Sequence, residues 1–146
     1  MSWRTDQANV PKLSLIPLLL AALVSIFFGV RYLFTREFMP YHAVVSGKSW
    51  SQLELGVQTA ILGMLKILGG GFVTYGLALL WLLLPLNRGE SWASWAALTI
   101  SAATLVPTLY VTIMLRRFEP KAKTPIAPTV VVVALVLAGV GASFLT

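Results

Sequence analysis

Few residues in this chain have side chains that could carry out chemistry. There is no cysteine and one histidine, His42, so thiolate nucleophiles, disulfides and metal sites built from several His or Cys residues are excluded. His42 is the only side chain that titrates near neutral pH in its unperturbed state. The five acidic residues lie at or beyond the edges of apolar segments, so the paired carboxylates of many proton-coupled pumps are missing. We expect no metal ion and no other cofactor.

Lys66 is the most unusual charged residue, because apolar residues and glycines flank it on both sides. A charge at the centre of a membrane helix costs about 2.5–3.5 kcal/mol on insertion scales. On a helix, Lys66 shares a small and polar face with Gly63, Gly70 and Thr74, which favours a position inside a bundle. Alternatively, Lys66 marks the start of the apolar core of its helix and extends its ammonium group to the lipid headgroups.

The segment near residues 35–56 contains more charged and aromatic side chains than a simple connection between two helices requires. It mixes charged, aromatic and apolar residues, which is typical of a segment that lies on a membrane surface and folds back on the helices. We expect Glu37 to supply the carboxylate that compensates Lys66, and the resulting site to bind an amphipathic molecule with a polar head. A histidine beside a tyrosine is also common on protein surfaces. The candidate ligand-binding residues are Lys66, Glu37, Tyr41, His42 and Arg36.

Four long uncharged stretches determine the predicted architecture. With 58% hydrophobic and only 11% charged residues, the chain cannot cover the surface of a soluble globule. Each stretch can cross a bilayer core of about 30 Å as a helix, and none has the two-residue alternation of barrel strands. We predict one all-α domain, an integral membrane four-helix bundle covering residues 1–146. The expected spans are about 13–34, 57–87, 91–115 and 125–146, with an interfacial loop at about 35–56.

The formal charge of +6 indicates membrane orientation and contact with anionic membrane lipid, not binding of nucleic acid. The first and third loops, with their flanks, carry seven Lys and Arg residues, whereas the opposite side carries three when Lys66 is left out. The positive-inside rule therefore predicts cytoplasmic first and third loops. We expect a multi-pass protein of the bacterial inner membrane, with both termini outside.

Small residues recur every four positions in all four spans. Residues four apart share one helix face, and small side chains let two helix backbones approach closely. We expect these rows to pack the bundle or to contact a second copy or another protein. On that basis Ala138→Leu should destabilise the protein and Val136→Leu should do little. The rows are Ala21/Ser25/Gly29, Gly70/Thr74/Ala78, Ala93/Ala97/Ser101 and Ala134/Ala138/Ala142.

One run of residues resembles a known group. Glu-Phe-Met-Pro-Tyr-His-Ala at 37–43, followed by Gly47, Trp50, Leu53 and the glycines at 69–71, is similar to small, uncharacterised bacterial inner-membrane proteins. These proteins are loosely DoxX-like in layout. The resemblance covers about residues 28–71 and implies a four-helix bacterial membrane protein. It brings no reaction and no functional residues with it.

The leading interpretation is a small multi-pass membrane protein that is not an enzyme, either an accessory subunit or a binder of a lipid-like or other apolar ligand. A small transporter is the first alternative, but the first span lacks the acid that small multidrug exporters share. A membrane enzyme acting on a lipid-like or sterol-like substrate is the second, with His42, Glu37 and Glu54 as acid–base groups. Emopamil-binding-type isomerases are similar in helix number, but they keep acids inside the bundle, and this chain does not.

Overall fold

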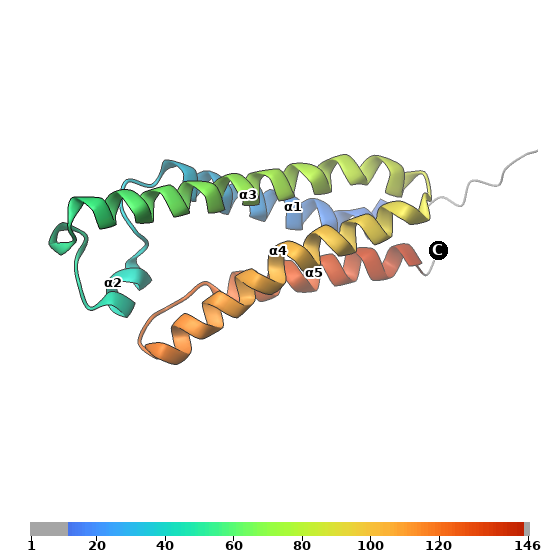
Figure 1. Cartoon of the computed structure of the whole chain (residues 1–146). Helices are drawn as coiled ribbons and strands as arrows, with labels where there is room; N and C mark the ends of the chain where they lie inside the picture. The colour runs from blue at the N-terminus through green and yellow to red at the C-terminus, as the bar shows by residue number, and fades with distance from the viewer. Residues whose placement is uncertain (1–11, 145–146) are drawn as a thin grey trace, which may run out of the picture.

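Helices make up all the regular structure in the part of the chain that the computed structural model describes, residues 12–144. A short helix and one 3-10 turn connect the first two long helices, and a tight turn connects the next two (Figure 1). The all-α prediction is therefore confirmed. The elements are α1 (Lys12–Phe34), α2 (Pro40–Ser46), η1 (Trp50–Gln52), α3 (Leu55–Asn87), α4 (Ser91–Phe118) and α5 (Ile126–Phe144).

The four long helices are each long and apolar enough to cross a membrane. Large apolar side chains also cover the outside of the bundle: Phe27, Ile67 and Trp81 are 63%, 80% and 73% exposed. On four apolar helices of membrane-spanning length, such a surface is typical of contact with lipid. The chain is a multi-pass membrane protein. Its helix bounds follow the predicted spans, although α4 continues beyond residue 115 and α3 begins before residue 57; residues 145–146 of the last span lie outside the described residues.

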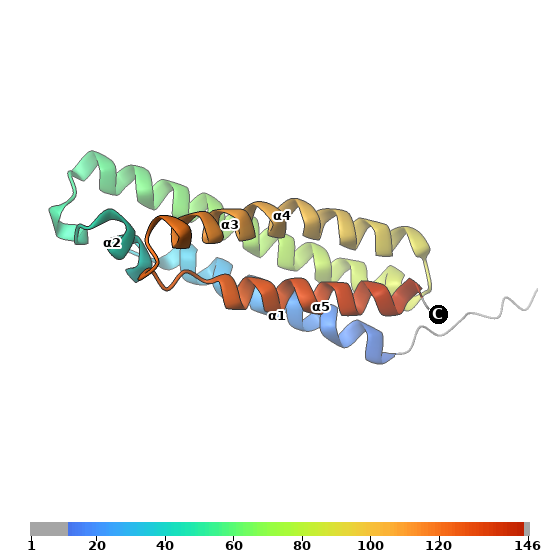
Figure 2. The same ribbon diagram turned by 90° about the horizontal axis from the view of Figure 1, so that it is seen from below.

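Successive long helices are antiparallel, and we describe them as two helix pairs, α1 with α3 and α4 with α5 (Figures 1 and 2). The pairs are joined mainly by α5, which packs against α1 as closely as against α4. The segments 35–54 and 119–125, which we call loop one and loop three, lie at the same end of the bundle. The turn between α3 and α4 and the end of α5 lie at the other end. In Figure 1 the end of α4 that leads into loop three diverges from the α1/α3 pair, toward the end of the bundle that carries α2.

Glycines hold α1 against α3. A Cβ atom on Gly69 would lie 2.7 Å from the carbonyl oxygen of Gly29, and one on Gly76 would lie 2.7 Å from that of Ala22, so the two backbones are in contact. The Ala21/Ser25/Gly29 row faces the interior as predicted. The row predicted for α3 is wrong, because Thr74 is exposed and Gly70 meets no neighbouring atom. The contact uses the adjacent face of the same helix.

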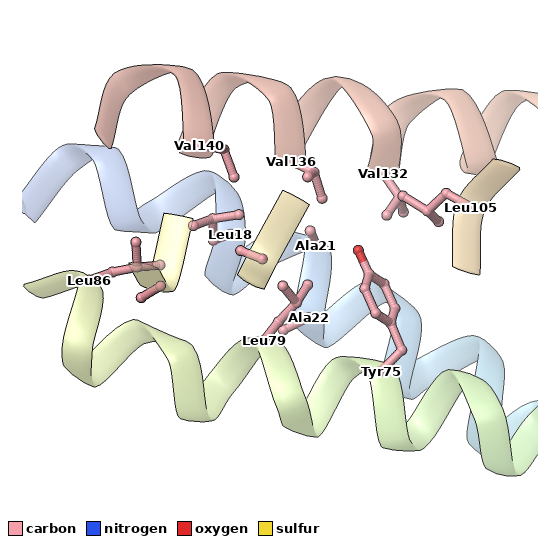
Figure 3. Close-up of a cluster of buried hydrophobic side chains, with 12 residues drawn as sticks. Leu18, Ala21, Ala22, Tyr75, Leu79, Leu86, Leu105, Val132, Val136 and Val140 are labelled. Carbon is pink, nitrogen blue, oxygen red and sulfur yellow. The ribbon is translucent and has the colours of Figure 1, made fainter. Parts of the chain in front are cut away.

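The end of the bundle opposite α2 is filled by apolar side chains. Figure 3 shows Val132, Val136 and Val140 of α5 pointing toward residues of α1 and α3, including Leu18 and Leu79. Hydrogen bonds of 2.8 Å also join α3 to α4 and α4 to α5; they link the Tyr75 and Ser101 hydroxyls and the Ser94 and Ser143 hydroxyls.

The small-residue rows of α4 and α5 differ in outcome. Ala93, Ala97 and Ser101 are buried as predicted, but Ala134 and Ala138 are exposed. The prediction for α5 is therefore wrong: this helix buries Val132, Val136 and Val140 and places Gly139 against the side chain of Leu18. Lipid and protein both accept small side chains, so the shape of the opposing helix decides which face is buried.

Candidate ligand-binding site

Loop one folds back over the end of the bundle. Phe38 and Met39 are buried in a second apolar cluster with Tyr32 of α1 and Leu65 of α3. Pro40 begins α2, because its missing N–H and fixed φ suit the first position of a helix. This packing fixes α2 beside α1 and brings its first turn to the space between the helix pairs.

The first turn of α2 carries Tyr41 and His42, whose rings lie 4.2 Å apart between centroids. The Tyr41 hydroxyl lies 3.2 Å from that of Tyr32, within hydrogen-bond distance. The Nδ1 atom of His42 accepts the backbone N–H of Met39 at 3.2 Å, so the proton of the neutral ring is assigned to Nε2. Burial raises the pKa of Tyr41, and the nearby Tyr32 raises it further. Burial lowers the pKa of His42, so both side chains are neutral.

A cavity of about 260 Å³ lies between the four long helices at this end of the bundle. Its polar wall residues are largely satisfied within their own helices. The hydroxyls of Ser25, Thr108, Thr112 and Thr129 each donate to a carbonyl oxygen three or four residues earlier, at 2.7–2.9 Å. The cavity therefore presents an apolar surface to a ligand, and Tyr41 and His42 supply polar groups at its α2 side.

The α4 wall of the cavity contains Pro107, which removes one helical hydrogen bond. The Thr108 hydroxyl bonds to the carbonyl oxygen of Thr104 nearby, and α4 continues without interruption to Phe118. Pro125, just before α5, and Pro128, in its first turn, lie in the opposite wall. The carbonyl oxygen of Thr104, one residue after the carbonyl that Pro107 leaves without its helical donor, is thus met within the helix.

A second cavity, of about 410 Å³, adjoins the first, because Phe28, Tyr32, Tyr41 and Pro125 line both. Its character is different. Arg31 at the end of α1 and Lys121 and Lys123 of loop three lie in its wall, and none of the described residues that line either cavity is acidic. We call this second cavity the basic vestibule. An apolar chamber thus continues into a cationic one at the end of the bundle.

Lys66 does not face into the bundle, which corrects the expectation from its helical face. It is exposed, and its ammonium group donates a 2.7 Å hydrogen bond to the carbonyl oxygen of Leu33. Leu33 belongs to the last turn of α1, whose carbonyl groups have no partner inside the helix, and a cation there also complements the helix dipole. Because α3 extends beyond the end of α1, Lys66 lies level with the last turn of α1. The alternative interpretation, that its ammonium group reaches the lipid headgroups, stays a prediction.

Two of the five candidate residues line a cavity and three do not. Tyr41 lines both cavities and His42 the apolar one, but Lys66, Glu37 and Arg36 are exposed and line neither. Loop one turns locally at Glu37, whose carbonyl oxygen accepts the Thr35 hydroxyl at 2.6 Å. The ammonium group of Lys66 bonds to the carbonyl oxygen of Leu33, and not to the carboxylate of Glu37 as expected.

Sequence reasoning missed the cations of the basic vestibule as site residues. Lys121 and Lys123 belong to the basic run of loop three, which we used to predict the membrane orientation. Nothing in the sequence placed these two lysines beside α1. Arg31-Tyr32, at the end of the first span, likewise gave no sign of contact with α2 or with loop three. Both facts follow from the arrangement of the helices.

Comparison of the chain with protein-family models, curated proteins and solved structures finds no match.

Proposed function

We propose that this protein binds one molecule of a lipid-like amphiphile and does not alter it chemically. The apolar tail occupies the cavity between the helix pairs, and the polar head lies at the end that carries loops one and three. The continuity of an apolar cavity with a cationic one carries this proposal. Small-molecule sites are about 300–1,000 Å³ and mostly apolar with a few polar groups; the cationic cavity of about 410 Å³ lies within this range and the apolar one of about 260 Å³ just below it.

Two observations support binding in preference to catalysis. The Nδ1 atom of His42 is engaged by the backbone of Met39, which suits a structural role better than proton transfer. The threonine and serine hydroxyls of the cavity wall donate to their own helices. The cavity wall therefore offers a ligand mainly shape and apolar contact.

We also propose that the protein resides in a bacterial inner membrane with loops one and three in the cytoplasm. Both loops lie at one end of the bundle and, with their flanks, hold seven Lys and Arg residues. Cysteines introduced at Ser46 and at Ser91 into this cysteine-free chain test the orientation. The first should resist an impermeant thiol reagent in intact cells and the second should react; the reverse pattern would contradict the proposal.

A bulky residue in the cavity wall tests the binding function. Val111 lines the cavity and is 43% exposed, so Val111→Trp adds volume without disturbing a packed contact. Val106 lies on the same helix, is 65% exposed and is not among the cavity-lining residues, so Val106→Trp is the matched control. Native mass spectrometry of delipidated protein then counts bound dioleoyl phosphatidylcholine, phosphatidylglycerol and phosphatidic acid.

We expect saturable binding of one lipid to the unmodified protein and to Val106→Trp, and a loss of about tenfold or more in Val111→Trp, because a filled cavity cannot accept an acyl chain. Equal binding by the two variants would mean that the cavity is not the binding site. Binding that never saturates would also contradict the proposal.

A further inference from the structure

The charge around the basic vestibule deepens the proposed function, on which this inference rests. We propose that the bound amphiphile carries a dianionic phosphate monoester head, held by Arg31, Lys121 and Lys123. Each of the three cations lines this cavity, and the apolar cavity that would hold the tail adjoins it.

The three cations come from two separate parts of the chain. Arg31 lies in the last turn of α1, and the two lysines belong to loop three. Loop three is itself shaped by Glu119, whose carboxylate accepts the backbone N–H of Lys121 at 2.9 Å, and Glu119 is not among the residues that line the vestibule. All three side chains are exposed, so solvent screens their mutual repulsion, and an anion bound among them would lower it further.

The number and type of these cations favour a phosphate monoester over a singly charged head. A monoester carries about −1.5 to −2 charges at neutral pH, whereas a carboxylate or a phosphodiester carries one. The Arg31 guanidinium can donate two parallel hydrogen bonds to phosphate oxygens, and each lysine adds a compact charge. Three cations therefore match a dianion better than a monoanion.

Neutral donors are also present where the two cavities meet. The Tyr32 and Tyr41 hydroxyls lie 3.2 Å apart, and a single bond between them uses one of their two protons, which leaves the other for a ligand oxygen. This free hydroxyl proton suits a ligand rich in acceptor oxygens.

Binding of lipids that share their acyl chains but differ in head group tests this inference on the full-length protein in detergent. The probes are dioleoyl phosphatidic acid (a monoester), phosphatidylglycerol (a singly charged diester), phosphatidylcholine (a zwitterion) and inorganic phosphate alone. We expect phosphatidic acid to bind at least about fivefold more tightly than phosphatidylglycerol. Inorganic phosphate should compete only at far higher concentration, because it lacks the tail.

Two double variants separate the vestibule from the general positive charge of this end of the protein. Lys121→Gln/Lys123→Gln removes two vestibule cations and should weaken binding of phosphatidic acid by about tenfold or more. Arg116→Gln/Arg117→Gln removes two charges from the end of α4 that do not line the vestibule, and it should change binding less than about twofold. Circular dichroism confirms that both proteins remain helical.

Each alternative result has a distinct meaning. Equal weakening by the two double variants, or equal affinity for phosphatidic acid and phosphatidylglycerol, would overturn the monoester head while leaving the apolar cavity as a binding site. Competition by inorganic phosphate at the concentrations where phosphatidic acid binds would show that free phosphate, not a lipid, is the ligand. If Val111→Trp has no effect while Lys121→Gln/Lys123→Gln abolishes binding, the proposed function fails and a headgroup site alone remains.

Discussion

The contact between α1 and α3 yields a prediction that adjacent residues can test, since three glycines follow one another in α3. A Cβ atom on Gly69 would lie 2.7 Å from both the carbonyl oxygen of Gly29 and the backbone N of Leu33. Cβ atoms on Gly70 and Gly71 would meet nothing within 4 Å. Gly69→Ala, Gly70→Ala and Gly71→Ala therefore make the same chemical change in three different environments.

The expected magnitudes follow from two opposing effects. Replacing glycine by alanine inside a helix contributes up to about 1 kcal/mol of stability, and all three variants share this gain. In Gly69→Ala alone, helix backbones in contact must separate by about 0.3–0.7 Å, because the blocking atoms are main chain and cannot rotate away. Overpacking of this kind typically costs about 1–3 kcal/mol. We expect Gly69→Ala to be less stable than Gly70→Ala by about that amount.

Unfolding by SDS in mixed micelles, followed by far-UV circular dichroism, measures the difference. Gly70→Ala and Gly71→Ala should unfold at the same or a higher SDS fraction than the unmodified protein, and Gly69→Ala at a lower one. Gly29→Ala, which changes the other side of the contact, should behave like Gly69→Ala. Equal transitions for Gly69→Ala and Gly70→Ala would refute the glycine contact between α1 and α3.

Two further predictions concern α5 and α2. Val136 is 3% exposed, whereas Ala138 is exposed. Val136→Leu should therefore lower the melting temperature in detergent through overpacking, and Ala138→Leu should leave it within about 1 °C. The opposite order of melting temperatures would show that the other face of α5 is buried. Because burial lowers the pKa of His42, the cap that its Nδ1 provides to Met39 is complete above the ordinary pKa of about 6.5 and is lost as pH falls below it. Hydrogen exchange of α2, corrected for intrinsic rates, should accelerate from pH 7 to pH 5 in the unmodified protein and not in His42→Leu; equally flat profiles would contradict this.

The fold class could be predicted from the sequence because it depends on composition and on uncharged length. A chain with 11% charged residues and four long uncharged stretches cannot cover the surface of a soluble globule. In lipid, helices satisfy the hydrogen bonds of their own backbone groups. Loop one was also predictable as a segment folded on the bundle, since aromatic and apolar residues such as Phe38 and Met39 need a surface to cover.

The helix faces were harder to predict. The rows of α1 and α4 were predicted correctly, but those of α3 and α5 were not, because alanine and glycine are accepted by lipid as readily as by a neighbouring helix. Gly69, and not Gly70, forms the contact because Gly29 of α1 lies opposite it. Val136, and not Ala138, is buried because its face of α5 packs against α1, where Leu18 lies. Neither is encoded in the periodicity of a single helix.

The candidate site shows the same division. The sequence by itself determined that Tyr41 and His42 lie in the connection between the first two long helices and that most Lys and Arg residues lie on one side of the four spans. Only the tertiary structure decided that Arg31 approaches Lys121 and Lys123, and that Lys66 bonds to the end of α1 and not to Glu37. The physical reason is that membrane insertion depends on apolar length and charge, which are sums along the chain. A binding site depends on which helix faces meet, and that is settled by packing between residues far apart in the sequence.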